Sequence, residues 1–141
     1  MTKVVYNACY GGFSLSHEGM LHYCKLAGIE VEPEETRYGF WAYRRKDREV
    51  PKPIADGKWL ELSLEQRSAR NRLLEAAYIS ERDFVRHDRY LVQTVEELGA
   101  AADGCSANLA IAEVTEGKYY IDEDDGMETV VQPSDVRWIE V

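Results

Sequence analysis

The sequence predicts an α+β fold in which an antiparallel sheet packs with about three helices in a single domain, residues 1–141. Three segments carry helix start signals followed by apolar residues at helical spacing. The β-rich runs stand at the beginning and near the end of the chain, and they do not alternate regularly with the helices. A length of 141 residues is that of one ordinary domain.

The first strand and the first helix are separated by a pair of glycines. The β-rich run Val4–Tyr6 leads towards Gly11 and Gly12, where a buried strand would end. Ser16 is placed to cap the helix that follows, and Gly28 stands where a helix favours a left-handed C-terminal residue. We therefore expect a strand, a tight turn and a helix in the first 28 residues.

The middle of the chain predicts a loop and a second helix. Residues 33–58 form a long irregular loop interrupted by prolines, with the aromatic stretch Tyr38–Tyr43 as a strand inside it. Ser63-Leu-Glu-Gln66 is a capping box, and the residues from there to Tyr78 are strong helix formers. One side of this second helix carries a basic patch over Arg67–Arg72.

A third helix begins after Asp88, which is a good N-cap residue, and ends near Gly104. Its apolar residues follow the spacing of one buried face: Leu91, Val92, Val95 and Leu98.

The C-terminal part predicts β structure. Leu109–Val114 and Lys118–Ile121 flank a loop that contains Gly117, which indicates an antiparallel hairpin. Thr129–Val131 and Val136–Ile139 are further β-rich pieces.

Composition excludes several classes of protein. The chain has 26 acidic and 17 basic residues, a net charge of -9, which disfavours direct binding to DNA or RNA. Three cysteines and an N-terminus without a leader pattern predict a reduced, cytoplasmic location. No apolar run is long enough to span a membrane, so we expect no membrane association.

The sequence predicts neither a metal nor a cofactor. The acidic stretch Asp122–Gly126 resembles a calcium loop, but Gly126 is its fifth residue, whereas an EF-hand requires glycine at the sixth position. An acidic turn at a hairpin explains the stretch better. The cysteines and histidines show no zinc-binding spacing.

Cys9 raises the hypothesis of a cysteine-dependent enzyme. It stands at a strand end beside glycines, and His87 with Asp88 would serve as base and orienting group. Cysteine is also one of the most frequently buried residues, so the sequence favours a packed thiol at Cys9 over a nucleophile. No other residue pattern indicates a catalytic centre, and the sequence favours a protein that is not an enzyme.

The glycine pair admits two interpretations. Backbone N–H groups at a helix N-terminus attract anions, so the turn could hold a phosphate, or it could be only a tight turn between strand and helix. Known nucleotide-binding motifs are absent. The candidate ligand-binding residues are Tyr10, Gly11, Gly12, Phe13, Ser14, Arg37, Tyr38, Arg86 and His87.

Three segments carry a resemblance to a known family: Asn7–Ser16, Arg86–Gly99 and Tyr119–Glu128. In this order they resemble a widespread family of small phage and prophage proteins with an N-terminal Asn-x-Cys-Tyr-Gly-Gly-Phe-x-Leu-Ser motif. The family has no established catalytic residues to carry over. The segment from Pro33 to Lys58 and the end of the chain from Gln132 differ from the family pattern.

A phage origin implies a protein that acts by binding in the cytoplasm of a host cell. The first hypothesis is sequestration of a small phosphorylated signal, such as a cyclic nucleotide or a cyclic ADP-ribose isomer, to counter host defence, as in anti-Thoeris sponges. Such a sponge would be a homo-oligomer with an arginine-rich, aromatic pocket, for which Arg44 and Arg45 are further candidates. The second is an acidic inhibitor of a host defence protein or of a complex that handles nucleic acid.

Overall fold

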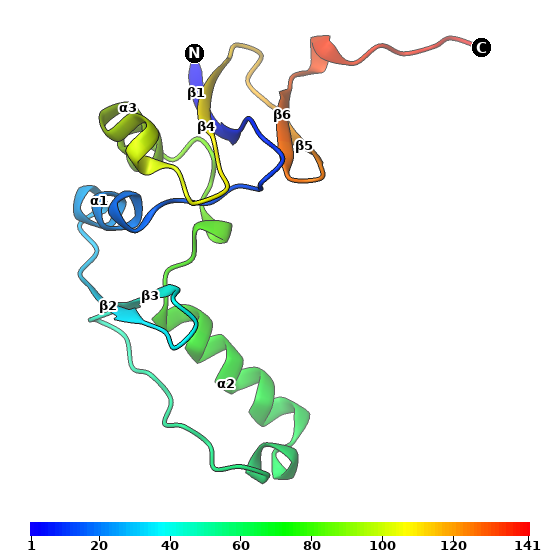
Figure 1. Cartoon of the computed structure of the whole chain (residues 1–141). Coiled ribbons are helices and arrows are strands. Elements are labelled where there is room, and N and C mark those ends of the chain that lie inside the picture. The colour runs from blue at the N-terminus through cyan, green and yellow to red at the C-terminus, as the bar shows by residue number, and fades with distance from the viewer. The chain divides into compact units, whose positions relative to one another are not determined.

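A computed structural model describes residues 1–141 and confirms the α+β class, with three α-helices and six strands (Figure 1). The chain comprises two compact units. The first contains residues 1–28 and 81–141, and the second contains residues 29–80.

The sheet of the first unit is built on its N-terminal strand. Strand β1 (Thr2–Asn7) pairs antiparallel with β4 (Leu109–Val114), with Val4 opposite Ala112. Val4 and Val5 are fully buried, as the β-rich pattern predicted for this run. Strands β5 (Tyr120–Asp124) and β6 (Met127–Val131) form a separate antiparallel hairpin.

The predicted hairpin between Leu109–Val114 and Lys118–Ile121 is wrong. The hydrogen bonds of β4 go to β1, and β5 pairs with β6 through a tight turn at Asp125 and Gly126. Both turn residues have positive φ, 50° and 88°, as a two-residue Asp-Gly hairpin turn requires. The acidic stretch that resembled a calcium loop is therefore a hairpin turn.

The strand predicted over Val136–Ile139 is also absent. The segment after the short 3-10 turn Pro133–Asp135 forms no helix or strand. Trp138 and Ile139 are 86% and 93% exposed. Both residue types are common in strands, but this segment pairs with no strand of the unit.

The two helices of the first unit begin at the predicted caps. Helix α1 (His17–Ala27) is capped by Ser16, whose side chain accepts the N–H of Gly19, and helix α3 (Arg89–Leu98) follows Asp88, which accepts two backbone N–H groups. The short 3-10 turn Gly99–Ala102 follows α3, and the 3-10 turn Glu81–Asp83 comes before it. The two helices pack on each other through buried apolar residues: Met20, Tyr23, Leu91, Val92 and Val95.

Close backbone packing explains two glycines of this unit. A Cβ at Gly11 would lie 1.6 Å from the carbonyl oxygen of Ser106, and a Cβ at Gly104 would lie 1.9 Å from Oγ of Ser14. Only glycine permits this approach of the segment after β1 to the segment before β4.

The second unit contains a hairpin and one long helix. Strands β2 (Val31–Glu35) and β3 (Trp41–Arg45) pair antiparallel, and helix α2 (Leu64–Ala77) begins at the predicted capping box. The expected irregular loop 33–58 thus contains the end of β2 and all of β3, while the residues from 46 to the 3-10 turn Lys58–Glu61 stay irregular. Tyr38 and Gly39 lie in the hairpin turn and not in a strand.

The glycine packing makes a prediction about stability. Gly11→Ala should lower the free energy of unfolding by about 3 kcal/mol, because its Cβ would collide with backbone that cannot rotate away. Gly28→Ala is the matched control: Gly28 has φ of 70° but open space around it, so only backbone strain of about 1 kcal/mol is expected. Urea unfolding measures both, and equal losses would contradict the packing explanation.

Candidate functional site

A largely buried ion pair joins the segment before α3 to strand β6 in the first unit. Arg86, in the segment before α3, donates from both terminal nitrogens to the carboxylate of Glu128 on β6, at 2.6 and 2.8 Å. The side chain of Glu128 is only 6% exposed and that of Arg86 is 19% exposed. The two-pronged geometry lets the guanidinium satisfy both oxygens of a carboxylate that has lost most of its water.

Asn7 extends this pair into a network. Its backbone N–H donates to Glu128 at 2.8 Å, and its side-chain amide donates to the carbonyl oxygens of Cys9 and Gly126. Its side-chain oxygen accepts the N–H of Asn108 at 2.9 Å. Asn7 is fully buried, and its hydrogen bonds join the end of β1 to the β5–β6 turn and to the segment before β4.

Two predicted ligand-binding residues belong to this network. The guanidinium carbon of Arg86 lies 3.5 Å from the centre of the Phe13 ring, which covers it from one side. Glu128 and Phe13 already engage Arg86, so these contacts have a structural role, and ligand binding by Arg86 and Phe13 stays a prediction. The network also brings together the three segments on which the family resemblance rests, since Asn7, Arg86 and Glu128 each come from one of them.

The glycine turn does not lead directly into the helix N-terminus. Between them, Ser14 accepts the N–H of Gly104 at 3.0 Å, and the backbone of Ser16 donates to Ala102 at 2.9 Å. The Ser16 hydroxyl already caps α1. Tight packing therefore accounts for Gly11, as described above, and a phosphate cradle at Gly11 and Gly12 stays a prediction, together with a role for Tyr10, which is 62% exposed.

The residues of the cysteine hypothesis have separate partners. The Cys9 thiol donates to the carbonyl oxygen of Ser106 at 3.1 Å and to the side-chain oxygen of Asn7. Asp88 caps α3 and also accepts the hydroxyl of Tyr23 at 3.0 Å. The structure thus shows Asp88 in a structural role, and a catalytic Cys9 stays a hypothesis.

Arg37 and Tyr38 lie in the second unit, in the turn of the β2–β3 hairpin. The guanidinium of Arg37 donates to the Tyr38 hydroxyl at 2.7 Å and lies 4.8 Å from the centre of its ring. Other arginines of this unit also have partners: Arg44 pairs with Glu34, Arg45 with Asp47, and Arg67 with the carbonyls of Trp59 and Leu60. A common site of Arg37 and Tyr38 with the first unit stays a prediction.

His87 lines an open hollow on the surface of the first unit. This hollow has a volume of about 470 Å³. Nδ1 of His87 lies 2.7 Å from the Tyr119 hydroxyl, and the two rings meet edge to face with their centres 5.7 Å apart. Partial burial raises the pKa of the Tyr119 phenol above its ordinary value, so the hydroxyl stays protonated at neutral pH. The lining residues are Thr2, His87, Val114, Gly117, Lys118 and Tyr119.

A second hollow, of about 580 Å³, shares Thr2 and His87 with the first. Lys3 and Arg89 line it, and Nζ of Lys3 lies 2.8 Å from the carboxylate of Glu96. The remaining lining residues are Met1, Val92 and Gln93. We call the two hollows together the His87 site.

The fold creates the His87 site from segments distant in sequence. Thr2 begins β1, Val114 ends the neighbouring β4, and Lys118 and Tyr119 stand in the connection to β5 at the same end of the unit (Figure 1). Sequence reasoning identified only His87, because the incorrect β4–β5 pairing placed Lys118 and Tyr119 inside a regular hairpin. The signal in the sequence that could have indicated Lys118 and Tyr119 was the run Lys-Tyr-Tyr, a cation beside two aromatic residues in an acidic protein.

Comparison of the chain with protein-family models, curated proteins and solved structures finds no match. The structure places no group of three or more His, Cys, Asp or Glu side chains where they could hold a metal ion. None of its helices has both the length and the apolar character needed to cross a membrane.

The buried pair makes a second stability prediction. Glu128→Gln should lower the free energy of unfolding by about 3 kcal/mol, because it leaves the guanidinium of Arg86 uncompensated in a largely buried place. Lys3→Gln, which breaks the exposed pair with Glu96, is the control and should leave stability unchanged within error. If urea unfolding gives the same free energy of unfolding for both variants, the buried ion pair does not stabilise the fold in the way described.

Proposed function

We propose that the first unit binds a small phosphorylated ligand at the His87 site and does so without catalysis. The observation that carries this proposal is the grouping of Lys118, His87 and Tyr119 around one hollow, with Lys3 and Arg89 in the adjoining one. A cation, an imidazole and a protonated phenol are groups that recognise a phosphate.

The charge distribution supports this position. The first unit has seven Lys or Arg residues and sixteen Asp or Glu residues. Three of those seven cations, Lys3, Arg89 and Lys118, line the two hollows. Glu96, the one carboxylate in the lining, is paired with Lys3, so Arg89 and Lys118 supply the net positive charge there. On a surface that otherwise repels anions, this is the place where an anion meets favourable charge.

The form of the first hollow agrees with a nucleotide-sized ligand. Its volume of about 470 Å³ lies in the usual range of small-molecule pockets. Val114 and Gly117 give it an apolar wall, while Thr2 and Tyr119 supply hydroxyl groups. The perpendicular rings of Tyr119 and His87 both line it, and they supply aromatic surface for contact with a base or sugar.

The ligand class follows from the resemblance described above. A phage or prophage protein with a binding site and no catalytic centre would act by sequestering a nucleotide signal of host defence. We propose this role, and expect cyclic nucleotides or cyclic ADP-ribose isomers to be the natural ligands.

A ligand panel tests the proposed function. Cyclic AMP, cyclic di-AMP, cyclic ADP-ribose and AMP are compared with adenosine as the uncharged control, and at least one phosphorylated compound should raise the melting temperature. Lys118→Ala should weaken its binding roughly tenfold, because a charged hydrogen bond to phosphate is lost. Lys25→Ala, on α1 and outside both hollows, should bind as the wild type does. No stabilisation by any of the four phosphorylated compounds, or equal losses in both variants, would contradict the proposal.

A second candidate function is inhibition of a basic protein surface. The observation that favours it is the location of the charge: the second unit has ten basic and ten acidic residues, so the net charge of -9 belongs entirely to the first unit. Four consecutive exposed carboxylates, Asp122 to Asp125, stand at the β5–β6 turn. They would match a basic groove that normally holds nucleic acid.

Charge removal at the hairpin tests this candidate. The variant Asp122→Asn with Glu123→Gln should capture less of a basic host protein than the wild type does, and added salt should weaken the capture further. Glu18→Gln with Glu65→Gln, both exposed and outside the hairpin, is the control with the same net charge. If the hairpin variant and the control capture the same proteins in the same amounts, the hairpin is not the docking surface.

A further inference from the structure

The chain after β6 is held firmly at one point. The side-chain oxygen of Gln132 accepts the backbone N–H groups of Thr115 and Glu116, at 2.8 and 3.2 Å. In return, the carboxylate of Glu116 accepts the N–H and the hydroxyl of Ser134. These bonds anchor residues 132–135 beside the β4–β5 connection.

That connection is part of the His87 site. Glu116 is followed directly by Gly117, Lys118 and Tyr119, which line the first hollow. The anchor of the C-terminal segment therefore lies next to the wall that carries the lysine of the proposed phosphate site.

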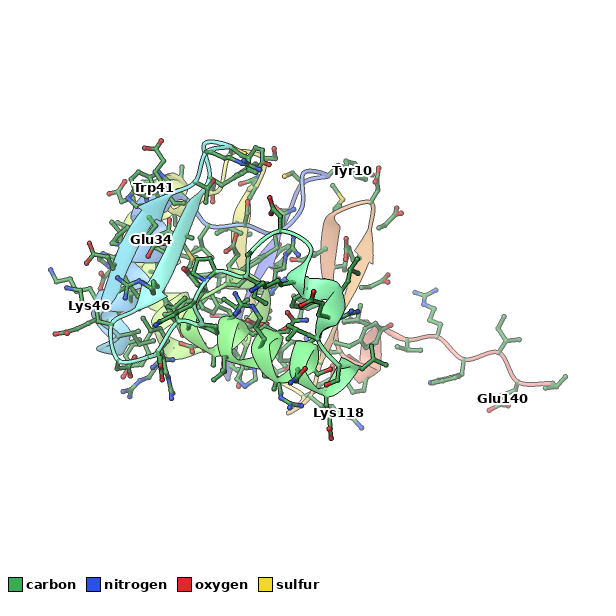
Figure 2. All side chains as sticks on the ribbon, turned by 90° about the horizontal axis from the view of Figure 1, so that it is seen from below. Tyr10, Glu34, Trp41, Lys46, Lys118 and Glu140 are labelled. Atoms are coloured by element: carbon green, nitrogen blue, oxygen red, sulfur yellow. The ribbon has the colours of Figure 1, made fainter.

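Beyond the anchor the chain is extended and exposed. Residues 136–141 form neither helix nor strand, and Figure 2 shows Glu140 far out along this segment. Trp138 is 86% exposed. Together with Ile139, which is 93% exposed, it places two adjacent large apolar side chains in water, and clustered exposed apolar surface is typical of interaction sites.

Trp138 lies only a few residues beyond the contact of Ser134 with Glu116, and Glu116 directly precedes Gly117 in the wall of the hollow. Trp138 follows the anchored Asp135 by three residues, which span roughly 10 Å when extended. We propose that residues 136–138 fold back over the first hollow when a ligand occupies it, so that the Trp138 ring packs on the ligand and closes the site. This inference rests on the proposed function, because it assigns a closing residue to the same site.

The chemistry of the hollow explains why such a residue is needed. The walls provide cations and hydroxyl groups, but the opening leaves one face of a bound base or sugar in contact with water. An indole ring stacks on any base and excludes water from it. Arg137 would arrive with Trp138 and add a cation near the phosphate.

Fluorescence of Trp138 reports the closure directly. In the full chain with Trp41→Phe and Trp59→Phe, Trp138 is the sole tryptophan. The emission of this protein is recorded with cyclic AMP, cyclic di-AMP, cyclic ADP-ribose, AMP and adenosine, together with its quenching by acrylamide. A phosphorylated compound that binds should shift the emission to shorter wavelength and protect Trp138 from the quencher.

Affinity provides the second measurement. Trp138→Ala should weaken binding of the same compound roughly tenfold, as loss of one stacking contact implies. Glu140→Gln, in the same segment, should bind like the wild type. Because Trp138 is exposed, its replacement leaves the melting temperature of the free protein unchanged, and a calorimetric melt checks this in every variant.

The outcomes separate this inference from the proposed function. A compound that binds and requires Lys118, but neither shifts Trp138 fluorescence nor loses affinity in Trp138→Ala, overturns the closure and keeps the binding site. If none of the four phosphorylated compounds binds, both the proposed function and the closure are rejected. Binding with both a shift and an affinity loss supports the closure.

Discussion

The ion pair of Arg86 with Glu128 is the interaction on which the first unit depends. A carboxylate that is 6% exposed is stable only when its oxygens are fully bonded, and here the guanidinium and the N–H of Asn7 supply those bonds. These bonds connect β1, the segment before α3 and β6. They also fix the backbone beside Arg86, whose carbonyl accepts the N–H of Val5, and so determine where His87 stands. The ion pair of Arg86 with Glu128 thus positions His87, the neighbouring candidate for ligand binding.

Much of the helical structure could be predicted because its signals are local. Ser16, Ser63 and Asp88 cap the three helices, and each accepts a hydrogen bond from an N–H within three residues. The strand pairing could not be predicted in the same way. Leu109–Val114 is a strand in either arrangement. The local pattern predicts a buried strand at Val4 and Val5, but it does not encode that Leu109–Val114 pairs with this strand and not with the nearer 118–121.

In the candidate site, too, the features that depend on residues distant in sequence could not be predicted. A glycine pair between a strand and a helix has the same sequence pattern whether it cradles a phosphate or lets two backbones approach closely. What distinguishes them here is the carbonyl of Ser106, distant in sequence, which occupies the space a side chain at Gly11 would need. The sequence around Arg86 likewise does not distinguish a ligand-binding arginine from a structural one, because its partner Glu128 is 42 residues away. His87 was recognised, but its neighbours Lys118 and Tyr119 became visible only with the correct pairing of β4.

The acidity of the first unit limits how it can bind an anion. Long-range attraction is absent, because sixteen carboxylates surround seven cations and the unit repels a phosphate at a distance. Affinity must then come from short contacts in a place shielded from water, where one lysine and one imidazole act in a lower dielectric. An open hollow does not provide that shielding. The proposed closure by Trp138, whose segment is anchored through Gln132 and Ser134 at Thr115 and Glu116, would supply that shielding.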